Sequence, residues 1–91
     1  DKIHLGQGVY AVYVKVKEEV YKGMLSIGTR PTIGEGDEKV EVNIFDFNEE
    51  IYRQEITVTV KKYLRPQVKY SNLYELEKQL AKDKEDSLRL L

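Results

Sequence analysis

The segment from Val9 to Val16 constrains the fold of this chain more than any other. It reads Val-Tyr-Ala-Val-Tyr-Val-Lys-Val, and such β-branched and aromatic residues favour a strand that is buried on most of its surface. The charged residues 17–19 interrupt this pattern, which resumes from Val20 to Ile27, so we expect an antiparallel hairpin. Gly28 is expected to end its second strand.

Two further strands are predicted downstream of a long loop over residues 29–39, which is rich in proline and glycine. The segment from Val40 to Phe47 alternates, and its two faces are Val40, Val42 and Ile44 against Glu41, Asn43, Phe45 and Phe47. The segment from Ile56 to Val60 alternates apolar residues with threonine. Residues 63–70 contain Arg65-Pro66, and because proline cannot donate to a strand ladder, we expect a loop or a sheet edge there.

Residues 71–91 predict a C-terminal amphipathic helix. Asn72 and Glu75 stand where an N-cap and its N3 partner belong, and Glu85 precedes Arg89 at the spacing of a surface ion pair. Leucines recur near helical spacing at Leu73, Leu76, Leu80, Leu88 and Leu91. We therefore expect one domain over residues 1–91, mainly all-β, with strands and loops over 1–70 and a helix over 71–91. Since four strands rarely close a barrel, further strands are expected upstream.

The composition excludes several classes of function. With 91 residues and no cysteine, the chain can hold neither a disulfide framework nor a thiolate zinc site nor a cysteine nucleophile. The net charge of -1 argues against a nucleic-acid or anionic-membrane partner, and the longest apolar run is too short for a membrane helix. We therefore expect a cytoplasmic protein. Because the first residue is Asp1 and not methionine, we also expect a piece of a longer polypeptide.

Two groups of side chains are candidates for chemistry. Glu41 lies within a predicted strand, where a carboxylate is disfavoured, so either this face is wet or the carboxylate has a function. The pattern alone leaves both interpretations open. Tyr63, Arg65 and Tyr70 offer a planar cation between two aromatic rings, which suits a flat polar ring system or a phosphate. Ordinary packing at a sheet edge explains this combination nearly as well.

Several motifs taken together resemble the riboflavin kinase family in order and spacing. They are Gly8-Val-Tyr-Ala-Val, Gly23-Met-Leu-Ser-Ile-Gly-Thr-Arg-Pro-Thr, Val40-Glu-Val-Asn-Ile-Phe-Asp-Phe-Asn, Ile51-Tyr52 and Tyr63-Leu-Arg-Pro. The resemblance implies a six-stranded antiparallel Greek-key β-barrel with a C-terminal α-helix, here lacking its first strands. In bacteria this domain is usually the C-terminal half of a bifunctional riboflavin kinase and FMN adenylyltransferase. The resemblance therefore also implies an adenylyltransferase domain in the same polypeptide.

The resemblance implies an ATP-dependent kinase that uses Mg²⁺ and converts riboflavin to FMN. Glu41 matches the catalytic carboxylate of the family, which accepts the proton of the ribityl 5'-hydroxyl as that oxygen attacks the γ-phosphate. Three positions match the nucleotide site of relatives, namely Asn43, Asp46 and Tyr52. Three positions match residues that line the flavin, namely Arg65, Val68 and Tyr70.

The chain departs from the family pattern in two places. The Pro-Thr-Ala-Asn motif, whose threonine and asparagine hold Mg²⁺ and phosphate, belongs upstream of Gly8 and is absent, so we assign no metal ligand in this chain and expect it to be inactive alone. Arg53 follows Tyr52 where relatives usually have glycine, which predicts a different turn. Two alternatives stay open: a flavin- or nucleotide-binding barrel without catalysis, and a small barrel that binds single-stranded nucleic acid through its seven tyrosines, which the charge disfavours.

Overall fold

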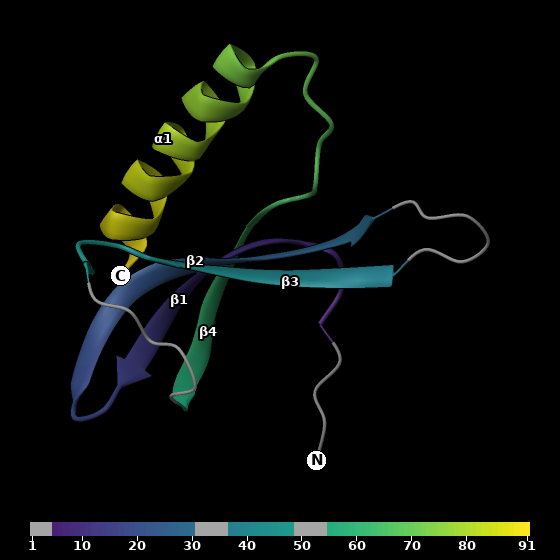
Figure 1. Cartoon of the computed structure of the whole chain (residues 1–91). Helices are drawn as coiled ribbons and strands as arrows, with labels where there is room; N and C mark the ends of the chain where they lie inside the picture. The colour runs from purple at the N-terminus through teal and green to yellow at the C-terminus, as the bar shows by residue number, and fades with distance from the viewer. Residues whose placement is uncertain (1–4, 31–36, 49–54) are drawn as a thin grey trace.

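Four antiparallel strands and one helix make up the part of the protein that the computed structural model describes, residues 5–30, 37–48 and 55–91 (Figure 1). The elements are β1 (Gly8–Val16), β2 (Glu19–Arg30), β3 (Asp37–Ile44), β4 (Ile56–Arg65) and α1 (Leu73–Leu90). The strands form one sheet in the order β3-β2-β1-β4. The mainly β fold class with a C-terminal helix is confirmed, and the described residues supply four of the six strands that the resemblance implies.

The predicted hairpin is confirmed, but its second strand is longer than expected. Val16 lies opposite Glu19, so β1 and β2 are joined by a two-residue turn. Gly28 does not end β2, because it pairs with Lys39 and the ladder with β3 continues to Arg30. The loop expected over 29–39 is therefore shorter at both ends, and β3 ends at Ile44, three residues before the predicted end. At Gly28 the neighbouring strand β3 supplies hydrogen-bond partners for the backbone N–H and C=O groups. This gain outweighs the entropic cost of ordering a glycine within a strand.

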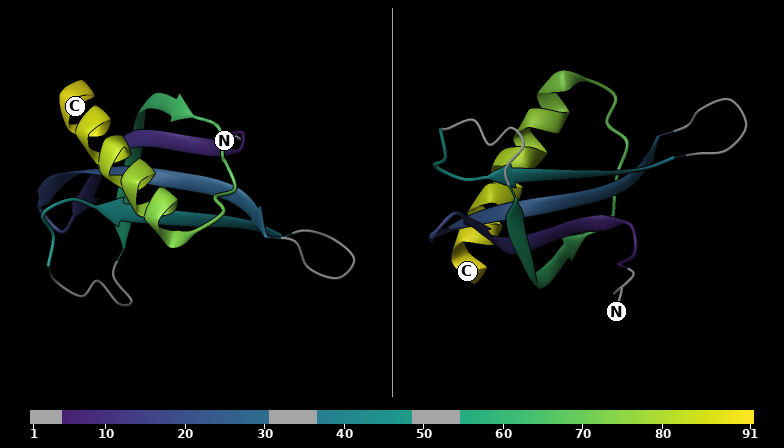
Figure 2. Two further views of the ribbon diagram at one scale, coloured as in Figure 1. Left: turned by 90° about the horizontal axis from the view of Figure 1, so that it is seen from above. Right: turned by 60° about the horizontal axis from the view of Figure 1, so that its bottom comes forward.

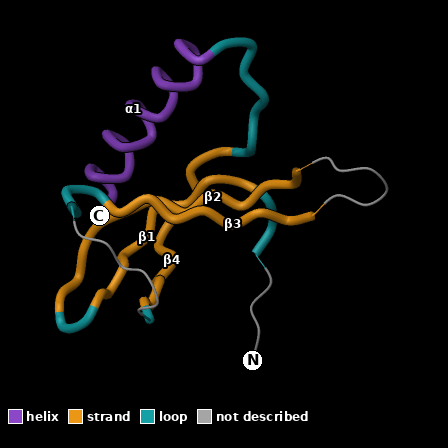
Figure 3. The backbone as a smooth tube through the Cα atoms, in the orientation of Figure 1, coloured by secondary structure: helices purple, strands orange, loops and turns teal. Residues whose placement is uncertain are grey.

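β4 also extends beyond its predicted end. The expected loop from residue 63 onward is wrong for residues 63–65, which stay paired with β1 through two register shifts. Pro66 then ends the strand, as its missing N–H group predicts. β4 is an outer strand of the sheet, so the expectation of an edge is confirmed. Residues 66–72 form an irregular link from β4 to the start of α1 (Figure 3).

The two faces of the sheet are both packed. One face holds the larger hydrophobic core, whose buried members are Tyr10, Val12, Val14, Val16, Leu25 and Ile27. The opposite face holds a smaller cluster of Val9, Met24 and Phe45. α1 crosses this second face and contacts β1, β2 and β4 (Figure 2). Burial on both faces explains why the sequence of β1 is apolar at nearly every position.

The start of α1 is as predicted, but its buried face is so only in part. The Asn72 side-chain oxygen accepts a hydrogen bond from the Glu75 amide at 2.9 Å, so the N-cap is confirmed. The leucine face is confirmed only in part: Leu76 and Leu80 line a cavity against the sheet, but Leu73 is 67% exposed. The fully buried helix residues are Asp83 and Ser87. A polar helix face can pack on the sheet because a strand residue pairs with the Asp83 carboxylate.

The predicted surface pair on α1 has a different partner. Arg89 does not pair with Glu85; its guanidinium lies 2.8 Å from a carboxylate oxygen of Asp86, which also pairs with Lys82. Asp86 is one residue closer to Arg89 and shares its side of the helix at the i, i+3 spacing. Among the described residues, no helix has the length and apolar character needed to cross a membrane.

Candidate functional site

A cavity of about 690 Å³ is lined by the sheet, the link after β4 and α1. Its apolar lining residues are Val9, Met24, Val42, Ile44, Phe47, Val68, Leu76 and Leu80. Its polar lining residues are Ser26, Glu41, Asn43, Arg65, Gln67 and Tyr70. Apolar walls with a few polar groups are typical of a binding site for a small molecule.

The strand register places four of these lining residues in one row across the sheet. Glu41 on β3 lies opposite Ser26 on β2, and Ser26 lies opposite Val9 on β1. Val9 in turn lies opposite Arg65 on β4. Directly opposed residues in antiparallel strands point to the same face, so this cross-strand row has a carboxylate at one end and a guanidinium at the other.

Glu41 is both exposed and part of the cavity wall. Its side chain is 65% exposed, and its carboxylate lies 3.4 Å from the Lys39 ammonium. Such an exposed pair contributes little to stability, so the carboxylate can turn towards the cavity at small cost. Of the two interpretations that the sequence left open, the wet face is therefore observed, and it adjoins the cavity.

The predicted nucleotide residues do not all lie together. Asn43 lies two positions after Glu41 on the same strand face and lines the cavity. Asp46 is an exposed residue in the turn after β3, with a φ of 55°, and it is not among the cavity-lining residues. Tyr52 lies outside the described residues. The structure thus brings Asn43, but not Asp46, next to Glu41.

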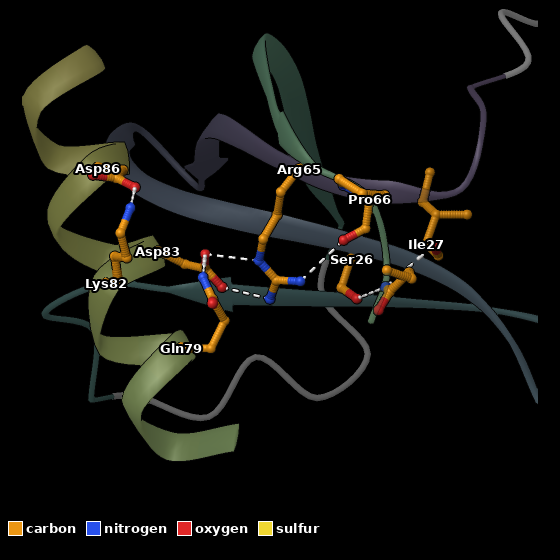
Figure 4. Close-up of polar contacts among 9 residues, drawn as sticks. Ser26, Ile27, Arg65, Pro66, Gln79, Lys82, Asp83 and Asp86 are labelled. Atoms are coloured by element: carbon orange, nitrogen blue, oxygen red, sulfur yellow. Dashed lines mark hydrogen bonds and ion pairs between the residues drawn. The ribbon is translucent and has the colours of Figure 1, made fainter. Parts of the chain in front are cut away.

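Arg65 is held in place at the other end of the row (Figure 4). Its Nε donates to Asp83 Oδ1 at 2.9 Å and its Nη2 donates to Asp83 Oδ2 at 2.6 Å. Its Nη1 donates to the Pro66 carbonyl at 3.1 Å. The hydrogen bonds to Asp83 raise the pKa of Arg65 above its ordinary value, although burial acts in the opposite direction. The guanidinium therefore stays charged and fixed in the cavity wall.

The predicted sandwich of Arg65 between two rings is wrong for Tyr63. The Tyr63 ring packs edge-on against Tyr10, with ring centroids 5.3 Å apart, and it does not line the cavity. A register shift in β4 separates Tyr63 from the cavity residues and places it opposite Tyr10. Tyr70 and Val68 do lie in the cavity wall with Arg65, as predicted.

Sequence reasoning missed two polar partners of the site. Asp83 on α1 anchors Arg65, and Gln67 in the link donates to the Ser26 hydroxyl and, at 3.3 Å, to the Ile27 carbonyl. A signal for Asp83 was present in the sequence. It follows Leu76 and Leu80 at the spacing of one helix face, so a carboxylate stands where an apolar residue is expected.

An antiparallel sheet with one helix across it, and a partly apolar cavity between them, is the architecture of a β domain suited to binding a small molecule. A family model described as Flavokinase, riboflavin kinase, matches residues 1–91, so the chain belongs to the riboflavin kinase family. The resemblance drawn from the sequence motifs is thereby confirmed.

Relatives with similar sequence carry names of the same kind. The chain is 41% identical over 85 residues to the bifunctional riboflavin kinase/FMN adenylyltransferase of Bacillus subtilis, covering 90% of this chain and 27% of that protein. It is 37% identical over 84 residues to the RNA-binding riboflavin kinase RibR of the same organism, covering 90% of this chain and 36% of that protein. The chain therefore spans well under half of the length of these relatives.

A solved structure has the same fold. It is a crystal structure described as a macrolide-efflux protein from Streptococcus pneumoniae, with a TM-score of 0.81 and 34% sequence identity. The match covers 89% of this chain and 27% of that one. The arrangement of sheet and helix described above thus occurs within a longer protein of known structure.

Proposed function

We propose that the complete protein containing this chain transfers the γ-phosphate of ATP to the 5'-hydroxyl of riboflavin and forms FMN and ADP. One observation carries this proposal. In a chain of the riboflavin kinase family, a carboxylate and a fixed guanidinium stand at opposite ends of one cross-strand row, and both line one cavity. A ligand with a flat ring at one end and an alcohol at the other fits such a row.

Glu41 acts as the general base in this proposal. The 5'-oxygen of riboflavin attacks the γ-phosphorus, the bond from that phosphorus to the bridging oxygen of ADP breaks, and the hydroxyl proton passes to the Glu41 carboxylate. An alcohol is a weak nucleophile near neutral pH, so a positioned base contributes typically about 10²- to 10⁴-fold. In this proposal Asn43, which is next on the same strand face and lines the cavity, donates its amide hydrogens to a phosphate oxygen.

The opposite end of the cavity receives the flavin ring. Arg65 supplies N–H donors for a ring oxygen, while Val68 and Tyr70 supply contact surface for the ring itself. Nucleotide contacts by Asp46 and Tyr52 stay predictions. With Glu41 and Asn43 towards the phosphates, the row separates the reacting end of riboflavin from its ring end.

We propose Mg²⁺ only as the ion that accompanies ATP. No group of three or more His, Cys, Asp or Glu side chains within the described ranges could hold a metal ion, and no step is assigned to a metal held by this chain. We also propose that an adenylyltransferase domain shares the polypeptide, because the Bacillus subtilis relative is named for both activities.

The test is Glu41→Gln in the complete protein. We expect kcat for FMN formation to fall at least about 100-fold, because the amide cannot accept the proton, while riboflavin affinity changes less than about twofold. Glu55→Gln is the matched control, since Glu55 is exposed and does not line the cavity. Near-normal turnover in Glu41→Gln would remove this carboxylate from the mechanism. Flavin binding without any turnover in the unmodified protein would favour the non-catalytic alternative.

A further inference from the structure

A charged side chain is buried beneath α1 at the edge of the cavity. Asp83 is 1% exposed, and carboxylates are almost never so buried unless they are paired. Its oxygens accept two hydrogen bonds from Arg65 and a third, at 2.9 Å, from Gln79 one helical turn earlier. Figure 4 shows the Arg65 side chain meeting the Asp83 carboxylate of α1, with Gln79 bonded to the same carboxylate.

The bonding of Arg65 leaves part of its donor capacity unused. A guanidinium has five N–H groups, of which two point to Asp83 and one to the Pro66 carbonyl. The other two have no protein partner among the residues that the structure describes. Since Arg65 lines the cavity, these two donors remain for a ligand, on a group whose plane is already fixed.

The net charge of the Arg65–Asp83 pair determines whether a charged or a neutral ligand oxygen binds there. The Asp83 carboxylate lies 2.6 Å from the guanidinium and compensates its positive charge within the cavity wall. A phosphate at this position would meet the field of Asp83 as well as that of Arg65. A neutral carbonyl oxygen carries no net charge, so the negative charge of Asp83 weakens its binding little. It still accepts hydrogen bonds from the two oriented N–H groups of Arg65.

We propose that Asp83, supported by Gln79, is a positioning residue that fixes Arg65 for a neutral ring carbonyl and disfavours an anion at this end of the cavity. α1 is therefore part of the binding site and not only a cover for the sheet. The proposal rests on the proposed function, in which the flavin ring lies at the Arg65 end. It adds the residues that set the ligand class at that end.

The test is Asp83→Asn in the complete protein, with Asp86→Asn as control. Asp86 carries the same side chain on the same helix, and its pairs with Lys82 and Arg89 lie outside the cavity lining. We expect Asp83→Asn to weaken riboflavin binding, measured by fluorescence quenching, about tenfold, the effect of one lost charge-assisted hydrogen bond. Lumiflavin, which has the ring without the ribityl chain, should lose the same factor. Affinity for ADP and kcat at saturating riboflavin should change less than about twofold, and Asp86→Asn should change none of these.

A second variant covers the case in which Asp83→Asn fails to fold. Arg65→Met combined with Asp83→Met replaces the pair by apolar side chains, an exchange that proteins often tolerate. We expect a folded protein that binds lumiflavin at least about tenfold more weakly and ADP normally.

Three results would overturn the proposal. Unchanged lumiflavin affinity in a folded variant shows that the pair does not touch the ring. Weaker ADP binding in Asp83→Asn with unchanged lumiflavin binding places Arg65 on the nucleotide side. Equal loss of all ligands, together with a lower melting temperature, shows that Asp83 only attaches the helix. The lumiflavin comparison needs no turnover, so a failure of the kinase proposal is seen separately, as absence of FMN formation by the unmodified protein.

Discussion

Replacing Ser87 with alanine should stabilise α1. The Ser87 side chain is fully buried, and its Oγ has no hydrogen-bond partner in the part of the chain that the structure describes. An unsatisfied buried hydroxyl costs about 1–3 kcal/mol, and alanine is a better helix former by about 0.5 kcal/mol. Removal of one oxygen atom leaves a small void that costs under about 1 kcal/mol. The net expectation is a gain of about 0.5–3.5 kcal/mol.

Amide hydrogen exchange in the complete protein measures this gain in stability directly in α1. Amides of α1 should exchange about tenfold more slowly in Ser87→Ala, since about 1.4 kcal/mol corresponds to a factor of ten. In thermal unfolding, the transition of this domain should move up by about 4–8 °C per kcal/mol. Glu77→Ala serves as control, because Glu77 is exposed on the same helix and reports the change in helix propensity alone.

The opposite result has a definite meaning. Faster exchange in Ser87→Ala, or a lower transition temperature, would show that the hydroxyl contributes a favourable interaction at the interface between helix and sheet. The assignment of an unsatisfied group at this position would then be wrong. An effect equal to that of Glu77→Ala would show that burial of the hydroxyl costs nothing.

Three further outcomes follow from the structure. Asn72→Ala should lower the free energy of unfolding by about 1 kcal/mol through loss of the N-cap, measured by urea titration. Gly23→Ala should cost about 1–3 kcal/mol in the same assay, because its Cβ would lie 2.5 Å from the Asn43 backbone oxygen. Hydrogen bonding to Asp83 raises the pKa of Arg65, so the stability it provides is complete below the ordinary pKa and is lost only as pH rises through the higher folded-state value. The loss of stability in Arg65→Met should therefore be constant from about pH 7 to about pH 10, and a decline within that range would contradict the assignment.

Local signals predicted the parts of the fold that depend on neighbours in sequence. The N-cap pair of Asn72 and Glu75 lies within one helical turn, and the hairpin of β1 and β2 closes through two residues, so both were predictable. The ends of β2 and β4 were not predictable. Pairing with another strand carries β2 past Gly28 and carries β4 past its register shifts, and no local pattern contains the partner strand.

The site was predictable only at the positions that resemble the family. Glu41, Asn43 and Arg65, which lie within the motifs, and Val68 and Tyr70, which follow the last one, all line the cavity. Their roles towards ligands stay predictions. The spacing of Asp83 after Leu76 and Leu80 was a signal that this residue is buried, but its pairing with Arg65 could not be predicted, because Arg65 lies 18 residues earlier in the chain. The leucine pattern held for Leu76 and Leu80 but not for Leu73 and Leu88, since the sequence does not show which helix side meets a charged strand end.

The spacing of the strands fixes the distance between the two ends of the row from Glu41 to Arg65. Adjacent strands lie about 4.8 Å apart, so three steps across the sheet set its two ends about 14 Å apart. Side-chain replacements change the chemical groups at the ends of this row but leave the spacing between the strands unchanged. Under the proposed function, a flavin whose alcohol chain is one carbon shorter stops short of the carboxylate, however well its ring is held.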